Sequence, residues 1–142
     1  MSDPLYAKPI LRLAADAHGA GRLADVTHTG TAHNPTCGDK VIVDLALNED
    51  GAVIAMAHET KACVLSQASA SILGEHLAGM DRAAVQDLRD AVAAMLAEPS
   101  AVPAPPFDGY GAFEGAVTFK NRHTCVLLPI DAVLAAFDAE RS

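Results

Sequence analysis

The chain contains three cysteines, Cys37, Cys63 and Cys125, whose thiols can bind a metal ion or carry sulfur. Cys37 lies in the stretch HNPTCGDKV, two positions before Asp39. In an extended segment, residues i and i+2 point to the same side, and an intervening glycine lets the backbone bend. We therefore consider Cys37 and Asp39 a candidate pair of metal ligands that face one point.

The other two thiols lie at boundaries between predicted elements. Cys63 lies where a strand pattern gives way to a helical one, and Cys125 lies shortly before the predicted C-terminal helix. A helix N-terminus favours the thiolate, which is the form that binds metals and attacks sulfur. With Cys37 and Asp39 these thiols can complete a four-ligand set, and thiolate-rich sets suit zinc and iron–sulfur clusters. A carboxylate in such a set is expected to be the more exchangeable ligand.

The same residues have other interpretations. Free cysteine is a common core residue, and Asn-Pro-Thr-Cys-Gly-Asp is equally typical of a turn. A hydrolase with Cys63 as nucleophile and one of the six histidines as base is disfavoured, because no recognised nucleophile signature surrounds Cys63. We expect Ser66, Ser69 and Ser71 to let a helix pack closely, rather than to bind phosphate or act as nucleophiles.

Composition limits the class of protein. The 142 residues carry 18 acidic and 10 basic side chains, a net charge of −8, which argues against nucleic acid as a partner. The longest apolar run, from Ala91 to Ala97, is far shorter than the ~18 residues of a membrane-spanning helix. The N-terminus lacks the pattern of a secretory signal, and three cysteines do not suggest a disulfide framework. We expect a cytoplasmic protein that binds neither membranes nor nucleic acid.

Hydrophobic periodicity and turn signals predict the elements that must position these residues. In chain order they are a helix within residues 2–18, an extended segment at 22–32, strands at 41–48 and 52–58 joined by a turn at 48–51, a helix within 61–79, a helix capped by Asp81 and ending near 98, a proline-rich loop or mobile link at 98–111, and a C-terminal helix with Pro129 in its first turn. This order indicates a single α+β domain over residues 1–142.

Three sequence blocks resemble the signature blocks of the IscU/SufU/NifU-N family of iron–sulfur cluster assembly scaffolds. They are NPTCGD at 34–39, KACVLSQASAS at 61–71 and NRHTCVLLPIDAVLAAF at 121–137, in the family's order. The resemblance implies a three-stranded antiparallel sheet with helices covering one face. It also implies that the ligands are Cys37, Asp39, Cys63 and Cys125.

Two functions follow from this resemblance. In the first, the protein is a scaffold that accepts sulfur from a cysteine desulfurase, assembles a [2Fe–2S] cluster and transfers it to apo iron–sulfur proteins. In the second, it is a zinc-dependent sulfurtransferase partner that accepts persulfide sulfur from a SufS-type cysteine desulfurase and stimulates it. Cys63 and Cys125 are the candidate sulfur acceptors. The expected cofactor is therefore zinc or a [2Fe–2S] cluster, held by the same residues.

The cysteine spacing resembles the SufU-like branch of the family. The 62 positions between Cys63 and Cys125 exceed the spacing of IscU-type scaffolds, and the proline-rich stretch at about 98–111 resembles the SufU insertion. Arg122, three residues before Cys125, resembles an arginine of the SufU pattern.

Two local departures from the family pattern affect the site. Thr124 stands where IscU-type proteins place a histidine directly before the third cysteine, so His123 is not expected to be a ligand. Ala62 replaces the usual glycine before the second cysteine, so the loop there is expected to differ if that position needs a positive φ. The ammonium of Lys61 is expected to lower the pKa of the Cys63 thiol.

Overall fold

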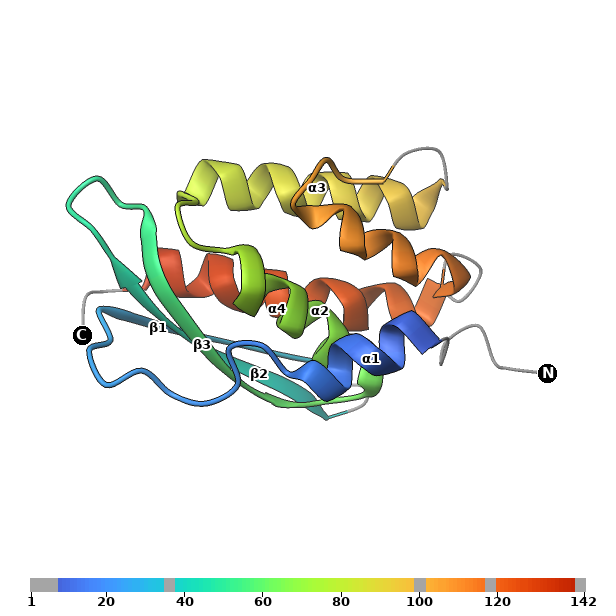
Figure 1. Cartoon of the computed structure of the whole chain (residues 1–142), viewed down its shortest axis with the longest axis horizontal. Coiled ribbons are helices and arrows are strands. Elements are labelled where there is room, and N and C mark those ends of the chain that lie inside the picture. Colours follow the sequence, from blue (N-terminus) through green and yellow to red (C-terminus); the bar gives the residue numbers. More distant parts are fainter. Residues whose placement is uncertain (1–7, 35–37, 99–101, 117–119, 140–142) are drawn as a thin grey trace.

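The computed structural model describes residues 8–34, 38–98, 102–116 and 120–139. Figure 1 shows the arrangement of the elements in these ranges. They are α1 (Lys8–Asp16), β1 (His28–Asn34), β2 (Asp39–Leu47), β3 (Val53–Lys61), α2 (Val64–His76), α3 (Arg82–Ala97), the 3-10 helices η2 (Phe107–Ala116) and η3 (Lys120–Arg122), and α4 (His123–Asp138). The predicted α+β class is confirmed.

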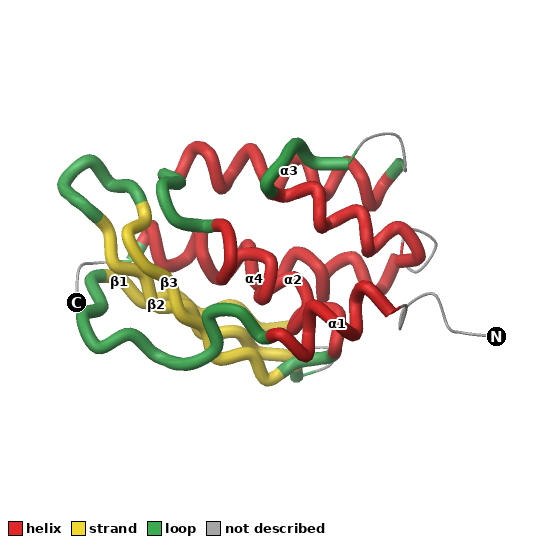
Figure 2. The backbone as a smooth tube through the Cα atoms, viewed as in Figure 1, coloured by secondary structure: helices red, strands yellow, loops and turns green. Residues whose placement is uncertain are grey.

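The strands of the described chain form one antiparallel sheet in the order β1-β2-β3 (Figure 2). Val41, Val43 and Leu45 of β2 are fully buried on one face, as the period of two predicted. The turn between β2 and β3 is closed by Asn48, whose Oδ1 accepts a hydrogen bond from the Ala52 N–H at 3.0 Å. The predicted hairpin is therefore correct.

Helices α2 and α4 pack on the sheet, and α3 packs on α4 away from the strands (Figure 1). Helix α4 approaches β1 very closely at Gly30. A Cβ added at Gly30 would come within 2.1 Å of the Ala136 nitrogen and 2.6 Å of the Ala132 carbonyl oxygen. This position in β1 therefore has room only for glycine.

Helix α3 begins as predicted, with Asp81 as its N-cap. The Asp81 side chain accepts a hydrogen bond from the Ala84 N–H at 2.8 Å. Val85, Leu88 and Val92 form part of its buried stripe. None of the helices in the described ranges has the length and hydropathy needed to cross a membrane.

The C-terminal helix begins earlier than predicted. Because α4 starts at His123, Pro129 lies inside the helix rather than in its first turn, and Cys125 lies within the helix rather than before it. An internal proline cannot donate a hydrogen bond to the carbonyl four residues earlier. Here that carbonyl belongs to Cys125, and the Ser66 hydroxyl donates to it at 2.7 Å. A residue of α2 thus satisfies the acceptor that Pro129 leaves free.

The proline-rich stretch is not a loop throughout. The helix η2 begins at Phe107, inside the segment predicted to be a loop or mobile link. Phe107 and Tyr110 are buried, and the Tyr110 hydroxyl lies 2.8 Å from Ser69 Oγ in α2. The end of the 98–111 stretch therefore adds aromatic residues to the core, which the prolines and glycines around them did not suggest.

The segment between α1 and β1 is tied to the sheet through Asp44. This side chain is 1% exposed and lies on the face of β2 opposite to the helices. Arg22 donates to it from Nε (2.6 Å) and Nη2 (3.0 Å), and the Thr29 hydroxyl donates at 2.8 Å. The Arg22 guanidinium holds the pKa of the Asp44 carboxyl below its ordinary value.

Replacing Gly30 by alanine should destabilise the fold by roughly 3 kcal/mol, because strand and helix backbones must separate to admit the new methyl group. Gly109→Ala is the matched control, since its Cβ would make only ordinary contacts with Ile72 at 3.6 Å and beyond. Urea unfolding of both variants measures the difference. Equal stability of the two variants would contradict the close contact at Gly30.

The Asp44 interaction should make stability depend on pH. The folded-state pKa lies below the ordinary value of 3.8, so ionised Asp44 stabilises the fold above that value and this contribution is lost as the pH falls through the lower folded pKa. Asp44→Asn should lower stability at pH 7 by roughly 2 kcal/mol and flatten the dependence below pH ~4. Unfolding midpoints from pH 7 to 2.5 test this, with the exposed Asp50→Asn as control. An unchanged pH profile in Asp44→Asn would contradict it.

Candidate metal centre

Three of the four predicted ligands come together at one end of the helical layer. The Asp39 carboxylate and the thiols of Cys63 and Cys125 each offer a ligand atom, and these atoms lie within 4.8 Å of one another. They come from the start of β2, the N-cap of α2 and the first turn of α4. The fourth predicted ligand, Cys37, lies outside the described residues.

Asp39 is positioned by the turn between β1 and β2. Gly38 has a φ of +77°, and its N–H donates to the Asn34 carbonyl at 2.8 Å. A residue with a Cβ adopts this conformation only at a cost, so glycine favours the turn. Because Asp39 shares the β2 face of the buried Val41, its half-buried carboxylate points toward the helices.

Cys63 is the N-cap of α2, with extended backbone angles of φ −65° and ψ 169°. Its thiol pKa is lowered to about 6, chiefly by a hydrogen bond from the Cys125 thiol, with further contributions from the N–H groups of Ser66 and Leu65 and from the Ser66 hydroxyl, and against the effect of burial. The lowered pKa agrees with the prediction from the sequence. The predicted cause was wrong, because Lys61 is not among the groups responsible.

The loop before Cys63 accommodates Ala62 without strain. Ala62 does not have a positive φ. Among the described residues, the non-glycine residue with a positive φ is Ala17. The Ala62 carbonyl accepts a hydrogen bond from the Gln67 side chain at 3.0 Å. Alanine in place of the family's usual glycine therefore fits this conformation.

Cys125 is 2% exposed, and its thiol points to Asp39 Oδ2 at 3.7 Å. The Ser66 hydroxyl holds its carbonyl and also lies 4.0 Å from the Cys63 sulfur. Ser66 thus contacts both cysteines. From the sequence we expected Ser66 and Ser69 to serve close packing, but each donates to a carbonyl of α4, and Ser69 does so at Val126. For Ser66, the sequence signal of this role was Pro129, which cannot donate a hydrogen bond to the Cys125 carbonyl four residues earlier.

The residues before Cys125 occupy the start of α4. Thr124 is exposed, and Arg122 and His123 are half-buried. His123 is not in the group of described residues whose ligand atoms converge.

The donor set is negatively charged once its thiols ionise. The Cys125 proton can be shared with the Cys63 sulfur or with an Asp39 oxygen, and a cation can replace it by binding all three atoms. Two sulfurs and a carboxylate suit zinc, which accepts thiolate and carboxylate ligands in a tetrahedral arrangement. They also suit iron–sulfur clusters, whose principal ligands are thiolates.

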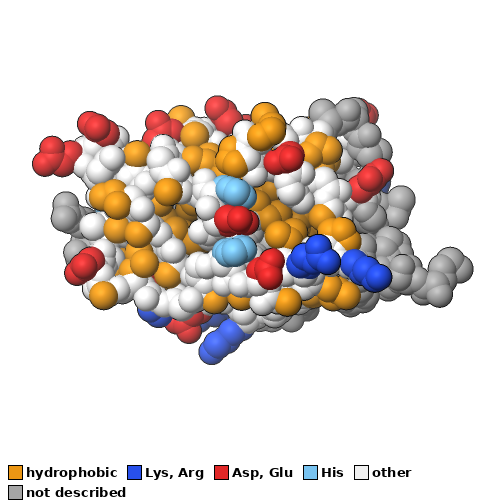
Figure 3. All heavy atoms as spheres, in the orientation of Figure 1, with side chains coloured by type: hydrophobic (Ala, Val, Ile, Leu, Met, Phe, Trp, Pro, Cys, Tyr) orange, Lys and Arg blue, Asp and Glu red, His pale blue; other side chains and the backbone are white. Residues whose placement is uncertain are grey.

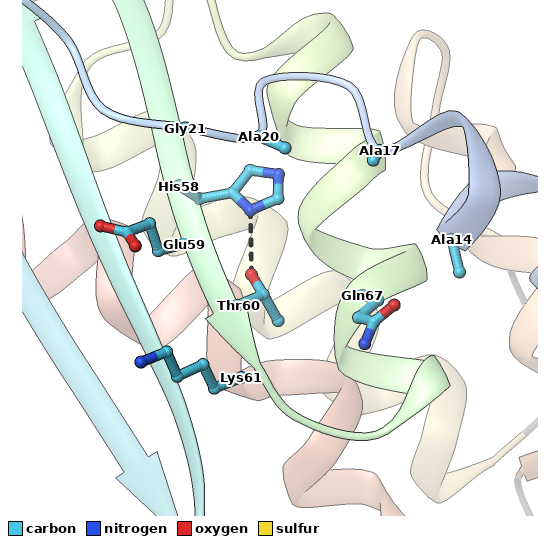
Figure 4. Close-up of a pocket in the computed structure, with 9 residues that line it drawn as sticks. All are labelled: Ala14, Ala17, Ala20, Gly21, His58, Glu59, Thr60, Lys61 and Gln67. Atoms are coloured by element: carbon cyan, nitrogen blue, oxygen red, sulfur yellow. Dashed lines mark hydrogen bonds between the residues drawn. The ribbon is translucent and has the colours of Figure 1, made fainter.

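A pocket of about 450 Å³ opens beside the loop that carries Cys63 (Figure 4). Lys61 and Gln67 line its end nearest to that loop, and Ala14 of α1 lines the opposite side together with Ala17 and Ala20, which follow α1. His58 lies in the wall of the pocket, and its Nδ1 is hydrogen-bonded to Thr60 Oγ1 at 2.9 Å. Burial lowers the pKa of His58. The pocket is therefore lined by alanines on one side and by polar and charged side chains of β3 on the other, with Lys61 next to the thiol loop.

Comparisons with known proteins agree with this fold. The family model described as the NifU-like N-terminal domain matches residues 5–125. A crystal structure of a nitrogen-fixing NifU-like protein (N-terminal) from Brucella abortus is 35% identical, with a TM-score of 0.88 over 96% of this chain and 94% of that chain. The fold of a putative iron–sulfur cluster assembly scaffold protein for the SUF system from Fervidobacterium islandicum is also similar, with a TM-score of 0.83 at 18% identity over 96% of this chain and 99% of that chain.

The iron–sulfur cluster assembly scaffold protein IscU of Thermotoga maritima is 37% identical over 75 residues. That match covers 53% of this chain and 52% of the relative, so it spans about half of each. The family model and the Brucella structure extend over most of the chain, and they agree with the resemblance in the three sequence blocks. The chain belongs to the NifU-like N-terminal domain family.

Proposed function

We propose that this protein is an iron–sulfur cluster assembly scaffold that builds a [2Fe–2S] cluster on Cys37, Asp39, Cys63 and Cys125 and passes it to apo-proteins. One observation carries the proposal: ligand atoms of Asp39, Cys63 and Cys125 lie within 4.8 Å of one another. Membership of the NifU-like family and the likeness to a scaffold protein of Thermotoga maritima support it. Cys37, two residues before Asp39 in the sequence, is proposed as the fourth ligand.

Exposure differs across the site and suggests how the cargo enters and leaves. Cys125 is buried, whereas Cys63 and Asp39 are half-buried. The side of the site formed by Asp39 and Cys63 is therefore the side open to partners. Asp39 offers oxygen, a poorer match than sulfur for a soft cluster, so it is the ligand that a recipient protein displaces first.

Cys63 is the proposed first acceptor of sulfur. Its thiolate attacks the terminal sulfur of the persulfide on a cysteine desulfurase, the sulfur–sulfur bond breaks, and the desulfurase cysteine leaves as a thiolate. This exchange needs no external oxidant or reductant. Reduction of each transferred sulfur to sulfide then requires two electrons from a separate electron donor. Cys125 is less accessible because it is buried, and it serves as the second candidate acceptor.

The zinc-dependent function uses the same residues. A zinc ion on two or three thiolates and the Asp39 carboxylate has the ligands of a tetrahedral site. Loss of one zinc–sulfur bond would free a thiolate for persulfide transfer from a SufS-type desulfurase. In both functions the domain extends over residues 1–142, with the SufU-like insertion at about 98–111, and the partners are a desulfurase and apo iron–sulfur proteins.

Untagged protein purified anaerobically without added metal distinguishes the two functions. Metal content, visible absorption and desulfurase stimulation are measured on one preparation, followed by reconstitution with iron, a desulfurase and cysteine. Cluster absorption that forms and then moves to an apo-ferredoxin supports the scaffold. Stoichiometric zinc that resists replacement, together with a stimulated desulfurase, supports sulfur transfer.

The Cys63 thiol of metal-free protein should ionise near pH 6, because the Cys125 thiol donates a hydrogen bond to the thiolate. Its rate of alkylation by iodoacetamide, followed by peptide mass spectrometry from pH 4 to 10, should rise with a midpoint of about 6. In Cys125→Ala the midpoint should rise toward the ordinary ~8.5. Lys61→Gln is the control and should leave it nearly unchanged. A raised midpoint in Lys61→Gln with none in Cys125→Ala would return the cause to Lys61.

Asp39→Ala should keep bound zinc or cluster while slowing its transfer to an apo-acceptor, roughly tenfold, because the exchangeable oxygen ligand is gone. Metal content and the rate of holo-ferredoxin formation measure the two effects separately. Asp50→Ala, in the exposed turn after β2, is the control for loss of a carboxylate. Loss of all metal in Asp39→Ala would mean that this residue retains the cargo instead of releasing it.

A further inference from the structure

One side chain from each strand forms a basic row across the end of the sheet that carries Asp39. His33 of β1 is in register with Lys40 of β2, and Lys40 is in register with Lys61 of β3. Paired residues of neighbouring antiparallel strands point to the same face of the sheet. All three side chains of the row are exposed. We propose that this basic row (His33, Lys40 and Lys61) docks an acidic helix of a partner protein.

The basic row lies on the face of the sheet opposite to the helices. Lys40 alternates with the buried Val41 and shares the face of Asp44. Figure 4 shows the side chain of Lys61 extending to one side of β3 and that of Thr60 to the other. A partner can therefore reach the row without displacing a helix of this protein.

The lysines of the basic row are not neutralised within the described part of the chain. None of the ion pairs found there involves Lys40 or Lys61. The nearest carboxylates of the same face in the strand register, those of Glu59 and Asp44, bind Arg22 at 3.3 Å and 2.6 Å. Like charges directly opposite each other on two strands destabilise the pair. Carboxylates of another molecule can relieve this repulsion.

Protection of the sheet edge does not explain both lysines. Lysine is common on edge strands, where it discourages pairing with the strands of other chains. Lys61 belongs to the edge strand β3, but Lys40 belongs to the central strand β2. The backbone of β2 is already paired on both sides, so Lys40 protects no free edge. A role in binding accounts for both residues.

The charge of the remaining surface gives an acidic partner a preferred orientation. The chain has a net charge of −8. Figure 3 shows acidic side chains spread over one face of the molecule, with fewer lysines and arginines, mainly in its lower half. Such a surface repels an acidic protein, whereas the basic row attracts it. Charge complementarity of this kind steers encounter and fixes the register of a complex.

The spacing of the basic row matches carboxylates along one face of a helix. Neighbouring strands lie about 4.8 Å apart. Residues three positions apart on a helix are separated by about 4.5 Å along its axis and lie on one face. A partner helix that crosses the strands with Asp or Glu at i, i+3 and i+7 therefore places a carboxylate near each side chain of the row. The two lysines supply charge, and His33 supplies an imidazole N–H.

Docking at the basic row brings the partner to the open side of the thiol site. Lys40 directly follows Asp39, and Lys61 is two residues before Cys63. Asp39 and Cys63 are the half-buried members of the site, whereas Cys125 is buried. The row binds an acidic helix whichever metal the thiol site holds, so its test does not depend on the proposed function.

Amide NMR of the isotope-labelled full chain, titrated with a synthetic helical peptide, tests the basic row. The peptide carries glutamates at i, i+3 and i+7 in a background of alanine and glutamine, and the same peptide with glutamine at these positions is the control. At low salt the acidic peptide should shift the signals of His33, Lys40 and Lys61, and about 0.5 M salt should abolish the effect by screening. Equal shifts with the glutamine peptide, or shifts centred on another surface, would overturn the proposal.

Paired variants separate the row from attraction to positive charge in general. Lys40→Gln/Lys61→Gln should weaken binding of the acidic peptide roughly fivefold, the loss expected for two exposed charge pairs. Lys8→Gln/Arg12→Gln, on the exposed side of α1, removes the same charge and should bind as wild type does. Equal weakening in both double variants would overturn the proposal. Tighter binding of a single-stranded oligonucleotide or of anionic phospholipid vesicles than of the peptide would do so as well.

Discussion

The hydrogen bond from the Ser66 hydroxyl to the Cys125 carbonyl is the contact on which the thiol site depends. It exists because Pro129 has no N–H to offer that carbonyl in α4. A buried carbonyl without a donor would be costly, so α2 must place Ser66 beside it. Since Ser66 is three residues after Cys63, this bond holds the start of α2, which carries Cys63, beside the first turn of α4, which carries Cys125.

The two sides of the site differ in how firmly they are held. Cys63 and Cys125 belong to the first turns of helices joined through buried hydroxyl–carbonyl bonds. Asp39 instead follows the Gly38 turn at the edge of the helical layer. A rigid pair of sulfurs facing a carboxylate next to a turn suits a site that keeps its metal through the thiols. Under the proposed function, exchange takes place at the oxygen.

Local sequence patterns predicted the hairpin and the cap of α3 correctly, because period-two alternation and Asp81 act over a few residues. They failed at Pro129, where the compensating donor, Ser66, is 63 positions earlier in the sequence and has no local signature. They failed again at Phe107 and Tyr110, which are buried through tertiary contacts with α2: Tyr110 with Ser69 and Phe107 with His76. For the site, the residue types and the resemblance pointed to Asp39, Cys63 and Cys125, but only the fold brings their ligand atoms together.

Helix α2 favours ionisation of Cys63 through the polarity of its backbone. Its N-terminus places N–H groups of Leu65 and Ser66 near the Cys63 sulfur, which favours a thiolate. A cation at the proposed thiol site would be attracted by the sulfur charge that the helix stabilises. The helix therefore does part of the work of preparing the site before any metal binds, because it lowers the pH at which the first thiol can become a ligand.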